Sequence, residues 1–265
     1  MCIGIFDSGV GGLTVWRELR RVMGGRFIYF GDTAHVPYGE KSPEQLMEYF
    51  WDIIDFFQQR EVKAVVVACN TMSAVVLPKV QDQVPLKLFG MIDAAVDAAV
   101  KVSHGKVGVL ATSSTAASGA YEEAFGRIRP TWDVTSQGCP RLVPLIEAGR
   151  TSGPEVEKAV AEYVKPLKNA AVDTIVLGCT HYPFVTSVIE HQVGSEIAIV
   201  DPAIRIGQEV SAWFGSKNEI RVEDRSSHTE FWVSRNPKGF QTLAQQFMGT
   251  MIPNVNLYEM AGEAE

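Results

Sequence analysis

The chain has 265 residues, a hydrophobic content of 46% and a formal net charge of −7. This length can hold one large domain or two modest ones with buried cores, and the composition is that of a soluble globular protein. The acidic balance, without a cluster of Lys and Arg, argues against nucleic-acid binding, and no apolar run reaches the roughly 18 residues that cross a bilayer.

The first residues, 1–6, are expected to form a strand. They contain neither the basic stretch nor the long apolar stretch of a signal peptide, which predicts a cytoplasmic protein whose thiols stay reduced. The four cysteines have no CxxC spacing, so we expect neither a zinc site nor a redox pair. They are Cys2, Cys69, Cys139 and Cys179.

Short apolar runs predict eight strands, and several runs, such as 65–67 and 175–177, are apolar at every position. Such runs are typical of parallel strands that are covered on both faces. The predicted strands cover residues 3–6, 27–30, 64–68, 86–90, 106–111, 132–136, 174–178 and 197–200.

Amphipathic segments lie between these runs, and the clearest covers 43–60. Its apolar residues recur at intervals of three and four, and Ser42, Pro43 and Gln45 are typical of a capped helix start. Further helices are expected at 203–214 and 237–248. Strands alternating with helices predict an α/β architecture with mainly parallel sheets.

The order of the motifs indicates an internal duplication. In the first half, strands end near Asp7 and Cys69, 62 positions apart; in the second half, strands end near Thr112 and Cys179, 67 positions apart. We therefore expect two pseudo-symmetric α/β domains facing each other across a central cleft, with all four strand ends in the cleft. The expected domains are 1–95 plus 207–265, and 96–206.

A glycine-rich loop, 7–14 (DSGVGGLT), follows the first strand. It is either an ordinary strand-to-helix turn or a place where a ligand approaches the main chain. Asp7 and Ser8 at the strand end favour the second interpretation, since a carboxylate there could hold an ammonium group or orient a base. The spacing differs from GxGxxG, which argues against a nucleotide site.

Three further polar segments have both a structural and a functional interpretation. The segment 32–39 (DTAHVPYG) is either a polar loop or a source of backbone donors for a carboxylate. The threonines and serines of 112–115 are either a helix cap or an anion cradle. Glu147 ends an apolar helical segment, 140–147, and is either a surface residue or part of a site.

Cys69 and Cys179 are the most informative pair, because each follows a buried strand and precedes polar residues. A single buried cysteine is usually inert packing, but two at equivalent strand ends favour function. A thiol at a helix N-terminus has a lowered pKa, and His181 could relay a proton. Two matched thiols suit a reaction that moves a proton from one face of a carbon to the other, which favours an isomerase.

Four segments, in this order, resemble the glutamate racemases, which belong to the cofactor-independent, two-cysteine aspartate/glutamate racemase family. The segments are 6–15 (FDSGVGGLTV), 32–39 (DTAHVPYG), 68–71 (ACNT) and 178–183 (GCTHYP), with further matches in 112–121 and 139–147. The chain departs from the family pattern at Ala111, where the family usually has glycine, but it retains Thr112.

The resemblance implies a cytoplasmic enzyme that interconverts L- and D-glutamate without a cofactor or metal and supplies D-glutamate for peptidoglycan. Cys69 and Cys179 would be the two bases, Asp7 and His181 their polar assistants, and Glu147 a third assistant. The substrate-binding residues would be Ser8, Pro37, Tyr38, Gly39, Asn70, Thr71, Thr112, Thr115 and Thr180. None of these is Lys or Arg, so carboxylate binding would rest on neutral donors and helix N-termini.

Other functions remain open at this point. An aspartate or hydantoin racemase of the same superfamily would differ in its side-chain pocket, and a non-catalytic binding protein could use the same two-domain scaffold. A thiol redox protein is disfavoured by the distance between the cysteines along the chain. The partner is expected to be a small molecule, with neither nucleic acid nor membrane, and a homodimer is one possible assembly.

Overall fold

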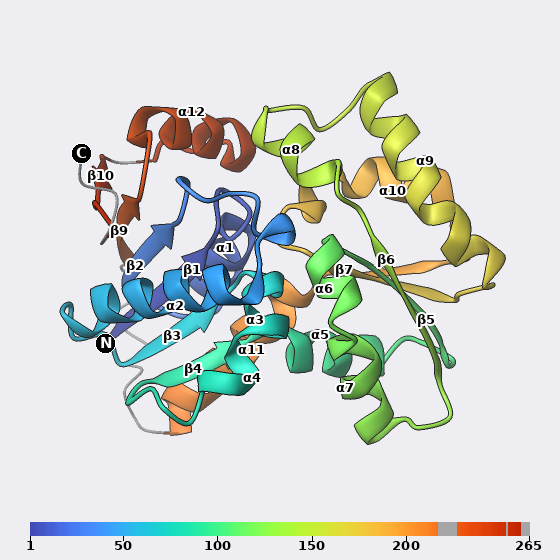
Figure 1. Cartoon of the computed structure of the whole chain (residues 1–265), viewed down its shortest axis with the longest axis horizontal. Coiled ribbons are helices and arrows are strands. Elements are labelled where there is room, and N and C mark those ends of the chain that lie inside the picture. Colours follow the sequence, from blue (N-terminus) through green and yellow to red (C-terminus); the bar gives the residue numbers. More distant parts are fainter. Residues whose placement is uncertain (217–226, 253, 261–265) are drawn as a thin grey trace.

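Two parallel sheets, one in each of two lobes, form the centre of the computed structural model (Figure 1). The structure describes residues 1–216, 227–252 and 254–260. The first sheet has the order β10-β9-β2-β1-β3-β4 and the second has the order β6-β5-β7-β8, with parallel pairing throughout. The strands are β1 (Cys2–Asp7), β2 (Gly25–Gly31), β3 (Ala64–Val67), β4 (Lys87–Gly90), β5 (Lys106–Ala111), β6 (Asp133–Gly138), β7 (Thr174–Gly178), β8 (Ala198–Val200), β9 (Ser227–Val233) and β10 (Val255–Leu257).

Helices cover both sheets and fill the junction between the lobes (Figure 1). In the first lobe they are α1 (Leu13–Val22), α2 (Pro43–Gln58), α3 (Asn70–Val75), α4 (Leu77–Val80), α11 (Pro202–Ser216) and α12 (Pro237–Met248), with the 3₁₀ turn η1 (Tyr38–Glu40). The others are α5 (Met91–Ala99), α6 (Ser113–Ala117), α7 (Ala120–Ile128), α8 (Leu142–Glu147), α9 (Pro154–Asn169), α10 (Thr186–Val193) and the 3₁₀ turn η2 (Tyr182–Val185). Within the described residues, every helix is too short or too polar to cross a membrane.

All eight strands expected from the apolar runs are present, and the α/β class with parallel sheets is confirmed. Two strands were not predicted, β9 and β10. β9 begins with polar residues and only its end, at Phe231 and Val233, is buried, while β10 has three residues. Neither segment has the continuous apolar run by which buried parallel strands are recognised.

The strand order supports the expected duplication. In the first sheet β2-β1-β3-β4 has the same arrangement as β6-β5-β7-β8 in the second, and β9 and β10 extend the first sheet beyond β2. The C-terminal part of the chain therefore returns to the first lobe, where β9 pairs with β2 from Gly25 to Gly31. The domain bounds 1–95 plus 207–265, and 96–206, stay a prediction.

Helix α2 begins as its sequence predicts. The Ser42 hydroxyl accepts the backbone N–H of Gln45 at 3.3 Å, the Ser42 N–H donates to Gln45 Oε1 at 3.0 Å, and Pro43 occupies the first helical position. This capping box satisfies N–H groups that the helix itself leaves unpaired. It fixes the start of the helix directly after the loop 32–41, which leads to the site.

Four strand ends meet at the junction of the lobes. β1 and β3 are neighbours in the first sheet and end at Asp7 and Val67, while β5 and β7 are neighbours in the second and end at Ala111 and Gly178. Side chains just beyond these ends bond across the junction: Thr180 Oγ1 lies 3.0 Å from Asp7 Oδ1. Ligands of parallel sheets bind at this edge.

Candidate active site

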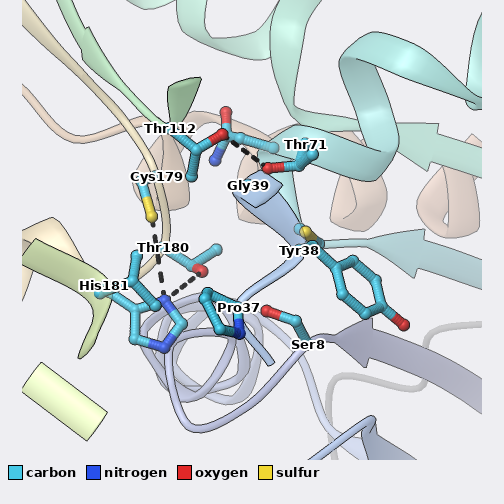
Figure 2. A pocket seen from close by; sticks show the side chains of 12 residues that line it. Ser8, Pro37, Tyr38, Gly39, Thr71, Thr112, Cys179, Thr180 and His181 are labelled. Carbon is cyan, nitrogen blue, oxygen red and sulfur yellow. Dashed lines mark hydrogen bonds between the residues drawn. The ribbon is translucent and has the colours of Figure 1, made fainter. Parts of the chain in front are cut away.

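A narrow pocket of about 270 Å³ lies between the lobes at the four strand ends (Figure 2). Eleven of the predicted site residues line it, together with one that was not predicted, Val143. The lining residues are Ser8, Pro37, Tyr38, Gly39, Cys69, Asn70, Thr71, Thr112, Val143, Cys179, Thr180 and His181. Both cysteines therefore face one small space, contributed by different sheets.

Cys69 is the N-cap of α3, and each cysteine is only 5% exposed. Burial raises the pKa of the Cys69 thiol, and the nearby charge of Asp7 raises it further, whereas the backbone N–H groups of Met72 and Thr71 lower it. The expected lowering by the helix N-terminus is thus present but outweighed by desolvation. We correct that expectation: the net effect of the surroundings is to raise the pKa of the Cys69 thiol.

Cys179 has a different neighbour, because His181 turns back toward it. The Cys179 Sγ lies 3.8 Å from Nδ1 of His181, and Nε2 of the same ring lies 2.7 Å from Oε1 of Glu147 (Figure 2 shows the Cys179 contact). Burial alone would lower the pKa of His181, but its hydrogen bonds to Cys179 and Glu147 and their negative charges raise that pKa well above its ordinary value. His181 is therefore placed to donate Nδ1–H to the sulfur.

Asp7 lies behind the pocket wall and does not line it. It is fully buried and accepts hydrogen bonds from the Thr180 hydroxyl at 3.0 Å and from the Gly9 N–H at 3.2 Å. Burial raises its pKa, while the charge of His181 and these hydrogen bonds oppose the rise. Asp7 therefore influences Cys69 through its charge and orients Thr180 through its hydrogen bond.

Glu147 is part of the site rather than a solvated surface residue. Its Oε1 accepts the Val10 N–H at 3.1 Å in addition to its contact with His181. The carboxylate thus joins α8 of the second lobe to the glycine-rich loop of the first. Val143 lies four residues earlier on the same helix and therefore on the same face; this spacing is the sequence signal that would have identified it.

The glycine-rich loop is explained by the close approach of side chains from the other lobe. A Cβ at Gly11 would lie 2.4 Å from both His181 Nδ1 and Thr180 Oγ1, and a Cβ at Gly9 would lie 2.1 Å from Glu147 Oε1. The loop is therefore a strand-to-helix turn whose missing side chains make room for Thr180, His181 and Glu147. The approach of a ligand to its main chain stays a prediction.

We expect Gly11→Ala to lower kcat/KM by about tenfold and to destabilise the protein by about 1–3 kcal/mol, because the methyl group overpacks against two ordered side chains. Steady-state kinetics and thermal denaturation measure the two effects. The control is Gly126→Ala in α7, where an added Cβ meets nothing within 4 Å and where alanine should stabilise the helix by up to about 1 kcal/mol. Equal behaviour of the two variants would disprove this account of the loop.

The loop 32–41 brings Tyr38 to the pocket lining and uses its phenol as an anchor. The Tyr38 hydroxyl donates to Asp32 Oδ2 at 2.5 Å, and Figure 2 shows its ring pointing away from Cys179 and His181. Tyr38 therefore offers its backbone to the pocket, and its phenol anchors the loop. Asp32 also accepts from Ser234 at 2.7 Å and contacts His35 at 2.8 Å; this anchor was missed, since Ser234 is remote in sequence.

Three threonines form a hydroxyl cluster across the junction. Thr71 and Thr112 lie 2.8 Å apart, Thr112 and Thr115 lie 2.9 Å apart, and Thr115 donates to Thr71 at 3.3 Å (Figure 2 shows the Thr71–Thr112 contact). Thr112 also caps α6 by accepting the Thr115 N–H. Thr115 is 1% exposed and does not line the pocket, so in this structure its hydroxyl supports the other two. Its contact with the substrate stays a prediction.

The pocket lining contains neither Lys nor Arg among the residues that the structure describes. Its polar groups are hydroxyls, the Asn70 amide, backbone groups and the His181 imidazole. Such a site can bind a carboxylate by neutral donors and by the N-termini of α3 and α6. The two thiols would then lie beside that carboxylate's molecule.

Comparisons with known proteins agree with this geometry. Residues 15–205 match the Asp/Glu/Hydantoin racemase family. A glutamate racemase from Desulforudis audaxviator is 41% identical over 93% of this chain and 93% of its own. The crystal structure of glutamate racemase isoform RacE1 from Bacillus anthracis has a TM-score of 0.91 at 31% identity and covers 97% of each chain. That of the Francisella tularensis enzyme in complex with D-glutamate has a TM-score of 0.90 at 30% identity and covers 98% of this chain and 97% of its own. The chain therefore belongs to the Asp/Glu/Hydantoin racemase family.

Proposed function

We propose that this protein is a glutamate racemase, an isomerase that interconverts L- and D-glutamate by proton transfer at Cα. The observation that carries the proposal is that Cys69 and Cys179, one from each sheet, line the same narrow pocket. The relatives named above are glutamate racemases over nearly the whole chain length, which favours glutamate over other amino acids.

The proposed reaction transfers one proton on each side of the α-carbon. One cysteine, as a thiolate, removes the α-proton, and the electron pair of the C–H bond remains on the carbon. The other cysteine, as a thiol, gives its proton to the opposite face, so that the substrate is inverted and the two sulfurs exchange protonation states. In one direction of the reaction Cys69 would be the proton donor, which its burial and raised pKa favour. In that direction Cys179 would be the thiolate base, which the neighbouring His181 N–H favours.

Substrate binding is proposed to use the neutral groups of the pocket. Ser8, Asn70, Thr71 and Thr180, with the backbone of Gly39, would donate to the two carboxylates, and Val143 would border the apolar part of the side chain. Hydrogen bonds that strengthen as charge develops on the α-carboxylate lower the barrier more than bonds of constant strength. With neither Lys nor Arg in the described lining, the carboxylates would be bound by neutral donors, and the charge of His181 would be directed to Cys179 and Glu147.

The biological setting is proposed on the same basis. The protein would supply D-glutamate for peptidoglycan from the cytoplasm, without a cofactor. The homodimer considered from the sequence stays a prediction.

Incubation with L-glutamate in D₂O, without added cofactor, tests the proposal. We expect D-glutamate to form and deuterium to appear at the α-carbon, measured by chiral chromatography and mass spectrometry. L-Aspartate serves as the comparison substrate and is expected to react at least about a hundredfold more slowly, since the pocket would then leave a polar donor unpaired. Absence of both inversion and deuterium incorporation with glutamate contradicts the proposal.

A further inference from the structure

Tyr121 lies between the two cysteine segments and connects them. It comes from α7, which lies in the second lobe (Figure 1), and its side chain is fully buried. Its hydroxyl donates to Asn70 Oδ1 at 2.8 Å, across the junction. On the edge of the ring next to the hydroxyl, a Cβ built on Gly178 would lie 3.2 Å from Cε2 of Tyr121. Tyr121 thus extends from the residue before Cys179 to the residue after Cys69.

In the structure this hydrogen bond is made by the oxygen end of the Asn70 amide. The carbonyl oxygen accepts from Tyr121, so the amide nitrogen keeps its two N–H donors, and Asn70 lines the pocket. A reversed amide would direct an oxygen toward a bound carboxylate and remove a donor. Because the lining contains neither Lys nor Arg, each neutral donor matters more for binding an anionic substrate.

Gly178 makes room for the ring edge beside the hydroxyl. The same added Cβ would lie 2.8 Å from Val109 Cγ1 and 2.9 Å from the Leu110 carbonyl oxygen, so the glycine lets strand β7, β5 and the ring pack together directly before Cys179. The ring is fully buried in this packing, which holds its hydroxyl beside Asn70.

We propose that Tyr121 is a positioning residue: it orients the Asn70 amide so that its N–H groups face the substrate carboxylate, and it does so only when the two lobes hold this arrangement. The inference rests on the proposed function, in which Asn70 binds a carboxylate of glutamate. Tyr121 itself stays behind the pocket lining and does not touch the substrate. Removal of its hydroxyl should therefore change substrate binding more than it changes the rates of the two proton transfers.

Tyr121→Phe removes the hydroxyl and keeps the ring. We expect KM for glutamate to rise about five- to tenfold, the effect of losing one hydrogen bond, with kcat within about twofold of wild type. In an Asn70→Ala background, Tyr121→Phe should change KM no further, because the amide that it orients is gone. The matched control is Tyr163→Phe, a buried tyrosine whose hydroxyl accepts from Arg141 outside the pocket; it should keep the wild-type KM.

Rescue separates positioning from a general structural role. Replacement of Tyr121 by p-aminophenylalanine restores a donor at the same place and should restore KM to within about twofold of wild type. An unchanged KM in Tyr121→Phe, an equal increase in the Asn70→Ala background, or a raised KM in the amino variant would each overturn the inference. Should Tyr121→Phe fail to fold, the amino variant alone decides between these outcomes.

The failure of the proposed function is distinguishable from the failure of this inference. If the wild-type protein neither binds nor racemises glutamate, the proposed function is refuted. The positioning role of Tyr121 is then tested by crystal structures of the variants. The Asn70 side chain should leave its wild-type rotamer or turn its amide in Tyr121→Phe and keep it in Tyr163→Phe. An Asn70 side chain that keeps its wild-type rotamer and amide direction in Tyr121→Phe overturns the positioning role.

Discussion

Replacing either Cys69 or Cys179 by serine is expected to lower the racemisation rate by at least about a thousandfold. Positioned general acid–base catalysis contributes about 10²–10⁴-fold per group, and a serine hydroxyl is a far weaker base than a thiolate. Because the two thiols line one pocket from different lobes, neither can replace the other: each reaches one face of the substrate.

Isotope exchange distinguishes the loss of one base from the loss of the whole site. With one thiol left, each variant should incorporate deuterium slowly into only one enantiomer of glutamate, without inversion, and the enantiomer should differ between Cys69→Ser and Cys179→Ser. Cys139→Ala is the matched control, since Cys139 is also buried but donates to the Gln137 carbonyl oxygen and packs in the second lobe. Full racemisation by either serine variant would refute the two-base assignment.

The parts of the fold that local sequence determines were predicted well. The strands β1, β3, β5 and β7 are nearly continuous runs of buried residues, and α2 carries its own capping box. The cysteines could be found because both follow such runs directly. β9 and β10 were missed because their strand character comes from pairing: β9 is held by β2, and most of β10 is exposed.

The site was predicted as a set of residues, but not in its arrangement. The motifs identify Tyr38 and Thr115, yet the direction of the Tyr38 ring depends on Asp32 and Ser234, and the burial of Thr115 depends on α3 of the other lobe. The pKa of Cys69 was predicted in the wrong direction, because a helix N-terminus can be recognised in sequence whereas desolvation is a property of the packed lobes. The direction of the Tyr38 ring, the burial of Thr115 and the pKa of Cys69 all depend on contacts between segments that are distant in the sequence.

The imidazole of His181 is expected to have the second-largest effect after the thiols. His181→Asn should lower kcat by about a hundredfold in the direction in which Cys179 is the base, and by less in the other direction. The reason is that Nδ1 of His181 lies 3.8 Å from the Cys179 sulfur, where its N–H stabilises that thiolate. Initial rates measured separately from L- and D-glutamate check this asymmetry. His191→Asn, an exposed histidine of α10, is the control, and equal losses in both directions would contradict the pairing of His181 with Cys179.

The pH dependence follows from the charges that surround His181. Burial alone would lower the pKa of His181, but the hydrogen bonds and charges of Cys179 and Glu147 raise it well above its ordinary value, so the imidazolium is favoured and is lost as pH rises through the folded-state pKa. The stabilisation that this group contributes to folding is complete below the unfolded histidine pKa of about 6.5 and disappears as pH rises through the folded-state pKa.

Glu147→Gln removes one negative partner and should lower the pKa of His181, which moves the high-pH limb of the kcat/KM profile to lower pH. The stability advantage of wild type over Glu147→Gln, measured by denaturant unfolding, should likewise narrow as pH rises. A limb that stays in place, or moves to higher pH, would show that His181 does not carry the proton that the site requires.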